Sequence, residues 1–117
     1  MHKTSRLAVL RSVWIIMSSY QVPVAKVELL SGRGFSVSIP DERGISLFAF
    51  HGKLNEPITD LSDQHWAADI VNTDGNGRWN YTNRNVELHK GDVIYYWTTV
   101  RFHGVDYQRM HQESEVP

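Results

Sequence analysis

Short alternations of apolar and polar residues, each closed by a turn residue, are the feature that most restricts how this chain can fold. Phe35-Ser-Val-Ser-Ile39 alternates strictly and stops at Pro40, so its three apolar side chains are expected to face a core. Val24–Leu30 is apolar at alternate positions in the same way. Both segments therefore predict β-strands with one buried face.

Two longer runs predict central strands. Ile45–His51 is almost continuously apolar, and Val93–Phe102 is rich in β-branched and aromatic residues, as expected for strands covered on both faces. Asp74–Gly77 and Lys90–Asp92 supply turn residues, and Phe102–Val105 predicts a hairpin tip. About seven short strands without long helical repeats predict an all-β fold, an immunoglobulin-like antiparallel β-sandwich of two sheets.

The segment Asp60–Val71 is ambiguous between helix and strand. Asp60 or Ser62 could cap a helix, and Trp66 and Ile70 stand four residues apart. We expect a short helical turn followed by a strand.

The chain of 117 residues predicts one domain at residues 20–117, preceded by a leader at residues 1–19. The leader resembles a secretory signal peptide, with Lys3 and Arg6 before an apolar stretch, although Arg11 interrupts that stretch. A disordered leader is the other interpretation. Cysteine is absent, so neither disulfides nor thiolate zinc sites can form.

Charge and motif spacing argue against several function classes. The formal net charge of -1 offers no concentrated basic surface, so neither a nucleic-acid nor a membrane partner is expected. Neighbouring Asp41 and Glu42 would point to opposite sides of an extended chain, which does not suit a glycosidase pair. The scattered histidines show no paired metal spacing, and there is no Gly-x-Ser-x-Gly elbow. We therefore expect no enzyme activity, no metal and no cofactor.

A sugar-binding site needs an aromatic ring that packs against the C–H faces of the sugar and fixed polar groups that pair with its hydroxyls. Gly77–Asn85 contains both kinds, because Arg78 and Arg84 flank Trp79 and Tyr81. In a regular strand, however, Trp79 and Tyr81 share one face and Arg78 lies on the other. The simplest packing then puts the aromatic rings inside the protein.

Three strings carry a family resemblance: Ile39-Pro-Asp-Glu-Arg-Gly44, Phe48-Ala-Phe-His-Gly-Lys-Leu-Asn55 and Gly77-Arg-Trp-Asn-Tyr-Thr-Asn-Arg-Asn85. Over about Tyr20 to Tyr107 the chain resembles the N-terminal domain of the invertebrate β-1,3-glucan recognition proteins, the Gram-negative-binding protein family. The resemblance implies a secreted, extracellular pattern-recognition module of innate immunity, which binds β-1,3-glucan of fungal or microbial walls without cleaving it.

The resemblance also implies a site on an open sheet face. It would include an exposed ring of Trp79 in Gly77-Arg78-Trp79, together with Arg78, Arg84, Asp41 and Tyr81 as ligand-binding residues. The indole would lie against the sugar rings, and the guanidinium groups would orient the polymer chain. Lys53 is expected to be a surface or loop residue, and Trp66 and Trp97 are assigned to the core.

Residues 108–117 depart from the family pattern, which continues into a further Trp-bearing strand. We therefore expect a missing final strand and an unpaired sheet edge, which favours self-association on glucan. The glucanase-like second domain of the family is also not found. The alternative function is accordingly a protein-interaction or decoy module of the same fold without sugar binding. Recognition of bacterial surface polymers is a third, and Asn80-Tyr-Thr82 is an N-glycosylation sequon.

Overall fold

The structure is a computed structural model, and it describes residues 20–117. The predicted leader lies outside the described residues. The described chain forms seven strands and no helix: β1 Lys26–Leu29, β2 Phe35–Pro40, β3 Ile45–Leu54, β4 Trp66–Ile70, β5 Arg78–Asn83, β6 Val93–Phe102 and β7 Val105–Glu115.

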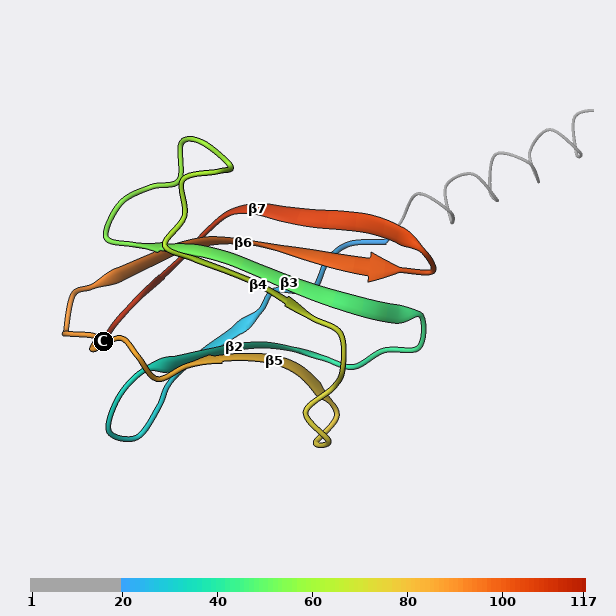
Figure 1. Ribbon diagram of the computed structural model, residues 1–117, viewed down its shortest axis with the longest axis horizontal. Helices are drawn as coiled ribbons and strands as arrows, with labels where there is room; N and C mark the ends of the chain where they lie inside the picture. Colours follow the sequence, from blue (N-terminus) through green and yellow to red (C-terminus); the bar gives the residue numbers. More distant parts are fainter. Residues whose placement is uncertain (1–19) are drawn as a thin grey trace, which may run out of the picture.

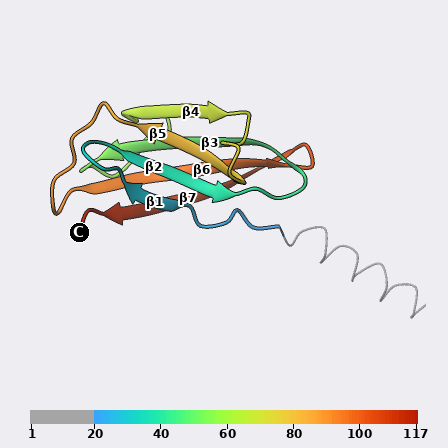
Figure 2. The same ribbon diagram turned by 90° about the horizontal axis from the view of Figure 1, so that it is seen from below.

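The strands form two antiparallel sheets packed face to face. The smaller sheet has the order β1-β2-β5, and the larger sheet has the order β4-β3-β6-β7. Figure 1 shows β2 and β5 below the larger sheet, and Figure 2 shows the strands of both layers from below. The expected immunoglobulin-like sandwich is confirmed. Its fourth strand pairs with β3 in the larger sheet, whereas the constant-type immunoglobulin domain places that strand in the other sheet.

The core lies between the sheets and follows the alternation read from the sequence. The three apolar residues of β2 are fully buried, as predicted. The central members of the core are Phe35, Val37, Ile39, Phe48, Phe50, Trp79, Ile94, Tyr96 and Val100. All nine are aromatic or β-branched, and they fill the space between two pleated sheets without any covalent cross-link.

Two expectations about secondary structure need correction. In Asp60–Val71 the expected strand is confirmed as β4, which begins at Trp66, but no helix precedes it: Asp60 accepts hydrogen bonds from the backbone N–H and hydroxyl of Ser62, which closes a turn. The final strand is not missing either. Residues 105–115 form β7, which pairs with β6 along nearly its whole length and covers the edge expected to be unpaired.

β7 contains a β-bulge that hid it from the alternation pattern. Tyr96 pairs with Gln112 and Thr98 pairs with Arg109, so Met110 and His111 together face the single residue Trp97. His111 has a φ of 57°, the left-handed conformation that such a bulge uses. The extra residue shifts the alternation by one position, and the strand reads as irregular.

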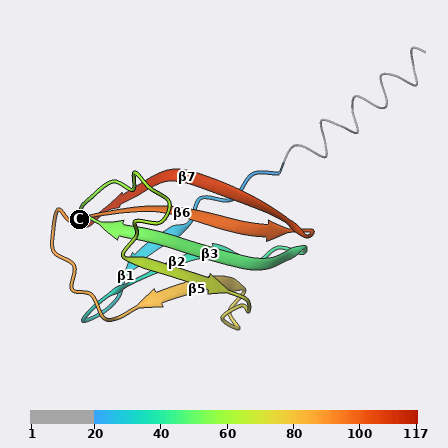
Figure 3. The ribbon, with the colours of Figure 1, turned by 45° about the horizontal axis from the view of Figure 1, so that its top comes forward.

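A long loop, residues 55–65, connects β3 to β4 over the outer face of the larger sheet. In Figure 1 this lime-green loop rises on the side away from β2 and β5, and Figure 3 shows it beside β6 and β7. Its anchor is Lys53, whose Nζ lies 2.7 Å from Asp63 and 3.1 Å from Glu56. Lys53 is 7% exposed and belongs to β3, so its expected placement at the surface or in a loop was wrong. The ion pairs with the loop explain how a lysine can be buried there.

Candidate functional site

The ends of β2 and β5 meet at a corner that brings together Asp41, Arg78 and Trp79. Asp41 follows Pro40, and its backbone N–H donates to the carbonyl oxygen of Gly77 over 2.8 Å. Asp74 shapes the preceding turn, because its carboxylate accepts from the N–H groups of Asn76 and Arg78. The backbone thus holds three sequence-predicted site residues side by side.

Trp79 does not present its ring to solvent. It is 5% exposed and packs between the sheets, so the expected exposed indole was wrong. The physical reason is alternation: Trp79 pairs with Ile39 in the neighbouring strand, and both residues face the core. The indole N–H donates to Asp41 Oδ1 over 2.8 Å, which ties the exposed carboxylate to the buried ring. Trp79 therefore positions Asp41.

Arg78 lies on the opposite side of β5 from Trp79, facing solvent. Its Nε donates to the hydroxyl oxygen of Ser38 over 2.8 Å, and a terminal nitrogen donates to the Ser38 carbonyl oxygen over 3.3 Å. These bonds hold the half-buried guanidinium against the sheet. A side chain fixed in this way loses little conformational freedom when it pairs with a ligand.

Tyr81 and Arg84 do not join the corner. Tyr81 faces inward, stacks on Phe50 with ring centroids 4.7 Å apart, and accepts a hydrogen bond from Asn83. Burial raises the pKa of Tyr81 above its ordinary value. Arg84 is exposed just beyond the other end of β5, about 20 Å along the extended chain from Arg78. Only a ligand that runs along β5 could contact both arginines.

The outward residues of the smaller sheet form a face of which the site prediction named only Arg78. Alternation puts them opposite the core, and we call them the polar face: Lys26, Glu28, Ser36, Ser38, Arg78, Asn80 and Thr82. Lys26 pairs with Glu28 at 3.3 Å, and the two serines are buried among their longer neighbours. The strict Phe-Ser-Val-Ser-Ile pattern that revealed the core already contained the signal for these serines.

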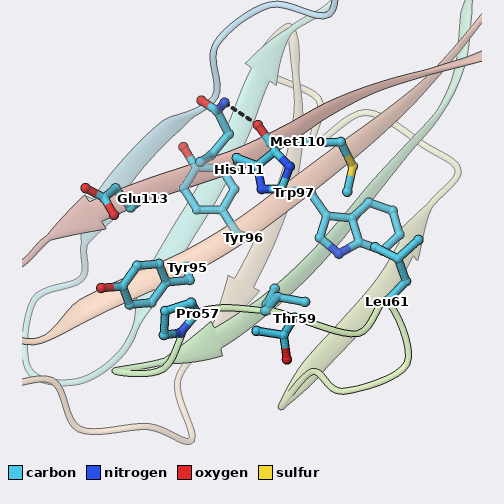
Figure 4. Close-up of a pocket in the computed structure, with 11 residues that line it drawn as sticks. Pro57, Thr59, Leu61, Tyr95, Tyr96, Trp97, Met110, His111 and Glu113 are labelled. Carbon is cyan, nitrogen blue, oxygen red and sulfur yellow. Dashed lines mark hydrogen bonds between the residues drawn. The ribbon is translucent and has the colours of Figure 1, made fainter.

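The outer face of the larger sheet carries a groove of about 500 Å³ between the 55–65 loop and strands β6 and β7. We call it the outer groove. Figure 4 shows the rings of Tyr95 and Trp97 on its floor, with Leu61 on the loop side and Met110 on β7. Trp97 is buried, as expected, but it lies on the outer face of β6 and not among the core residues between the sheets.

Within residues 20–117, no group of three or more His, Cys, Asp or Glu side chains is placed to hold a metal ion. Over the same residues, no helix is long and apolar enough to cross a membrane.

Comparison with known proteins identifies the family. The family model CBM39, described as a carbohydrate binding domain (family 32), matches residues 21–117. Gram-negative bacteria-binding protein 3 of Drosophila melanogaster is 50% identical over 92 residues, which are 79% of this chain and 19% of that protein. Beta-1,3-glucan-binding protein 1 of Galleria mellonella is 42% identical over 116 residues, 99% of this chain and 23% of that protein.

Beta-1,3-glucan-binding protein 2 of Manduca sexta is 48% identical over 97 residues, 83% of this chain and 20% of that protein. This chain thus spans about a fifth of the length of these relatives. A solved structure, the Br derivative of BhCBM56, has a TM-score of 0.60 and 19% identity, covers 83% of this chain and 97% of its own, and shows the shared β-sandwich fold. The chain belongs to the family of carbohydrate-binding domains that the CBM39 model describes.

Proposed function

We propose that this domain binds β-1,3-glucan of fungal or microbial cell walls, as a pattern-recognition module of innate immunity, and does not cleave it. Relatives that match most of this chain are named for binding this polymer. The polar face is the proposed contact surface, entered from the corner of Asp41 and Arg78.

The observation that carries the proposal is the corner itself. Asp41 and Arg78 come from the adjoining ends of β2 and β5, and each side chain is held in place by a hydrogen bond: the Trp79 indole N–H donates to the exposed carboxylate of Asp41, and Arg78 Nε donates to Ser38. Carboxylate oxygens accept hydrogen bonds from sugar hydroxyls, and guanidinium N–H groups donate to them. Arg84 extends this surface along β5 for a polymer that lies parallel to the strand. Tyr81 and Trp79 support the surface from the core side.

Secretion belongs to the same proposal, supported by the signal-like sequence before residue 20. Association between copies on a shared polymer belongs to it as well, because one long chain offers many equal stretches to separate domains. The sheet edge that was expected to be unpaired gives this no support, since β7 pairs with β6 there.

Retention on insoluble curdlan tests the proposal. The wild-type protein is expected to be retained and to be released by soluble laminarin. Arg78→Ala is expected to weaken retention about tenfold or more, because it removes charge-assisted hydrogen bonds. Arg101→Ala is the matched control, since Arg101 is exposed on the larger sheet and pairs with Asp106 at 2.8 Å. Circular dichroism verifies the fold of both variants.

Other outcomes would point to other functions. A folded wild-type protein that curdlan does not retain contradicts the proposal and favours a protein-interaction or decoy module. Release by a bacterial surface polymer but not by laminarin would assign a different ligand. New reducing ends in laminarin incubated with the domain would contradict binding without cleavage.

A further inference from the structure

The outer groove lies on the opposite side of the sandwich from the polar face, and the proposed function leaves it unused. Its lining combines three elements that are distant in sequence: the 55–65 loop, β6 and β7. The lining residues are Pro57, Ile58, Thr59, Leu61, Tyr95, Tyr96, Trp97, Met110, His111, Gln112 and Glu113. Its volume of about 500 Å³ falls within the range of small-ligand sites in proteins.

Packing holds the principal aromatic ring of the groove in a fixed orientation. Trp97 stacks on His51 of the adjacent strand, with ring centroids 4.0 Å apart and planes 7° from parallel. The register of β3 and β6 pairs the same two residues. Because His51 supports the indole from one side, the ring cannot swing away when a ligand enters the groove.

The bulge of β7 shapes the opposite wall. Met110 and His111 are the two residues that face Trp97 there, and both line the groove. A bulge commonly re-aims side chains toward a functional site. His111 accepts a φ of 57°, which is uncommon for a residue other than glycine, so this wall costs the fold some backbone strain.

The loop that forms the third wall is held down by charge. Nζ of Lys53 bonds Asp63 over 2.7 Å and pairs with Glu56, while the backbone N–H of Leu54 donates to His65 Nδ1. These contacts fix both ends of the 55–65 loop against β3. The groove is therefore preformed.

The chemistry of the lining selects the kind of ligand. Aromatic groups cover the floor and mainly apolar residues form the loop wall. Thr59, His111, Gln112 and Glu113 supply hydroxyl, imidazole, amide and carboxylate groups. No lysine or arginine is among the lining residues and Glu113 is one of them, so the groove offers an anionic polymer no permanent positive charge. Trp97 is 8% exposed, and its indole N–H is buried without a hydrogen-bond partner among the described residues. A donor left unpaired beside an aromatic floor suits a ligand with both hydroxyls and C–H faces.

We propose that the outer groove is a second binding site for a neutral sugar, independent of the polar face. The identity of that sugar, a β-1,3-linked glucose oligomer, rests on the proposed function. One domain would then hold two stretches of polymer, one on each side of the sandwich. Linking two weak sites in this way raises the retention on a polymer well above that of either site alone.

The test counts sites and locates them. Calorimetry with laminarihexaose is expected to give two hexasaccharides per wild-type domain, and the indole N–H resonance of Trp97 is expected to shift during the titration. Leu61→Asp places a charge on the loop wall and should weaken groove binding about tenfold or more. Leu61 is 55% exposed and lies outside the core, so the variant should fold.

Two variants complete the design. Val71→Asp is the matched control, because Val71 is another exposed aliphatic residue, 61% exposed, that does not line the groove. It should leave both sites intact. Arg78→Ala should remove one hexasaccharide per domain and leave the shift of the Trp97 resonance unchanged.

The outcomes separate the two proposals. If the wild-type domain binds one hexasaccharide and Leu61→Asp does not change this binding, the outer groove is not a binding site and the proposed function still stands. Binding that Leu61→Asp removes and Arg78→Ala does not affect supports the groove and contradicts the polar face. No binding by the folded wild-type protein overturns both proposals.

Discussion

At the scale of single residues, the fold joins polar groups to buried aromatic rings. Asp41 receives the N–H of Trp79, and His51 lies flat against Trp97. In each case a polar side chain gains a fixed position from an aromatic neighbour. Loss of the Asp41 carboxylate would leave a buried donor unpaired, which typically costs about 1–3 kcal/mol.

His51 is expected to make stability depend on pH. Burial lowers its pKa below the ordinary value of 6.5, and the Asp69 carboxylate raises it by less. The folded pKa is thus below the unfolded one, so the contribution of neutral His51 is complete above about pH 6.5 and declines as the pH falls toward the folded pKa.

Urea unfolding of wild type and His51→Phe at about pH 7.5 and about pH 5.5 measures this effect. Phenylalanine keeps a flat ring on Trp97 and carries no proton. The wild-type midpoint should fall more between the two pH values than that of the variant. Equal changes in the two midpoints would show that His51 does not cause the pH dependence of stability.

At the scale of elements, the turn between β1 and β2 packs directly against the end of β5. Gly34 has a φ of 93°, and a Cβ built there would lie 2.0 Å from the carbonyl oxygen of Asn83. Gly32, two residues earlier, has a φ of 89° but nothing within 4 Å of such a Cβ. Substitutions at these two glycines therefore separate the cost of a positive φ, which both share, from the cost of steric overlap, which arises only at Gly34.

Gly34→Ala is therefore expected to be much more destabilising than Gly32→Ala. The Gly32 variant should lose about 1 kcal/mol of unfolding free energy through its positive φ alone. The Gly34 variant should lose about 3 kcal/mol or more, since β5 must also move. Equilibrium urea unfolding of both proteins gives the comparison, and equal losses would mean that β5 does not approach the turn this closely.

At the scale of the whole molecule, the two outer faces of the sandwich are chemically different and separated by the core. The polar face carries the sequon residue Asn80, whose side chain lies on the outside of β5. A glycan attached there would cover the polar face and leave the outer groove open.

Asn80→Gln is accordingly expected to increase curdlan retention of protein secreted from eukaryotic cells, by removing that cover. Intact-mass measurement first establishes whether the wild-type protein carries the glycan. The same variant made in bacteria, which add no such glycan, serves as the control and should match the bacterial wild type. If an occupied wild type and the variant bind equally, the polar face is not the main contact surface.

Much of this architecture could be predicted from the sequence, because alternation is a local signal. The three apolar residues of β2 and the two long central strands follow it, and the sandwich follows from them. Alternation also predicted that Trp79 lies in the core, which is correct. The expectation of an exposed ring came from the family resemblance and was wrong. The strand β7 was missed because its bulge breaks the pattern at Met110 and His111.

The site was less predictable, because it depends on contacts between distant segments. Nothing local in His-Gly-Lys53 indicates that ten residues later Asp63 will return to pair with it. The outer groove depends on that pairing. Similarly, the bond between Trp79 and Asp41 joins residues 38 positions apart, and only the register of β2 with β5 brings them together.

The bulge in β7 has a consequence for the solubility of the domain. β7 is the outermost strand of its sheet and exposes unpaired backbone groups that could recruit a neighbouring molecule in the manner of amyloid. The kink at His111 interrupts that row, so a straight strand from another copy cannot bond along its full length. In the proposed function, where many copies gather on one polymer, this kink is expected to limit edge-to-edge pairing between crowded copies.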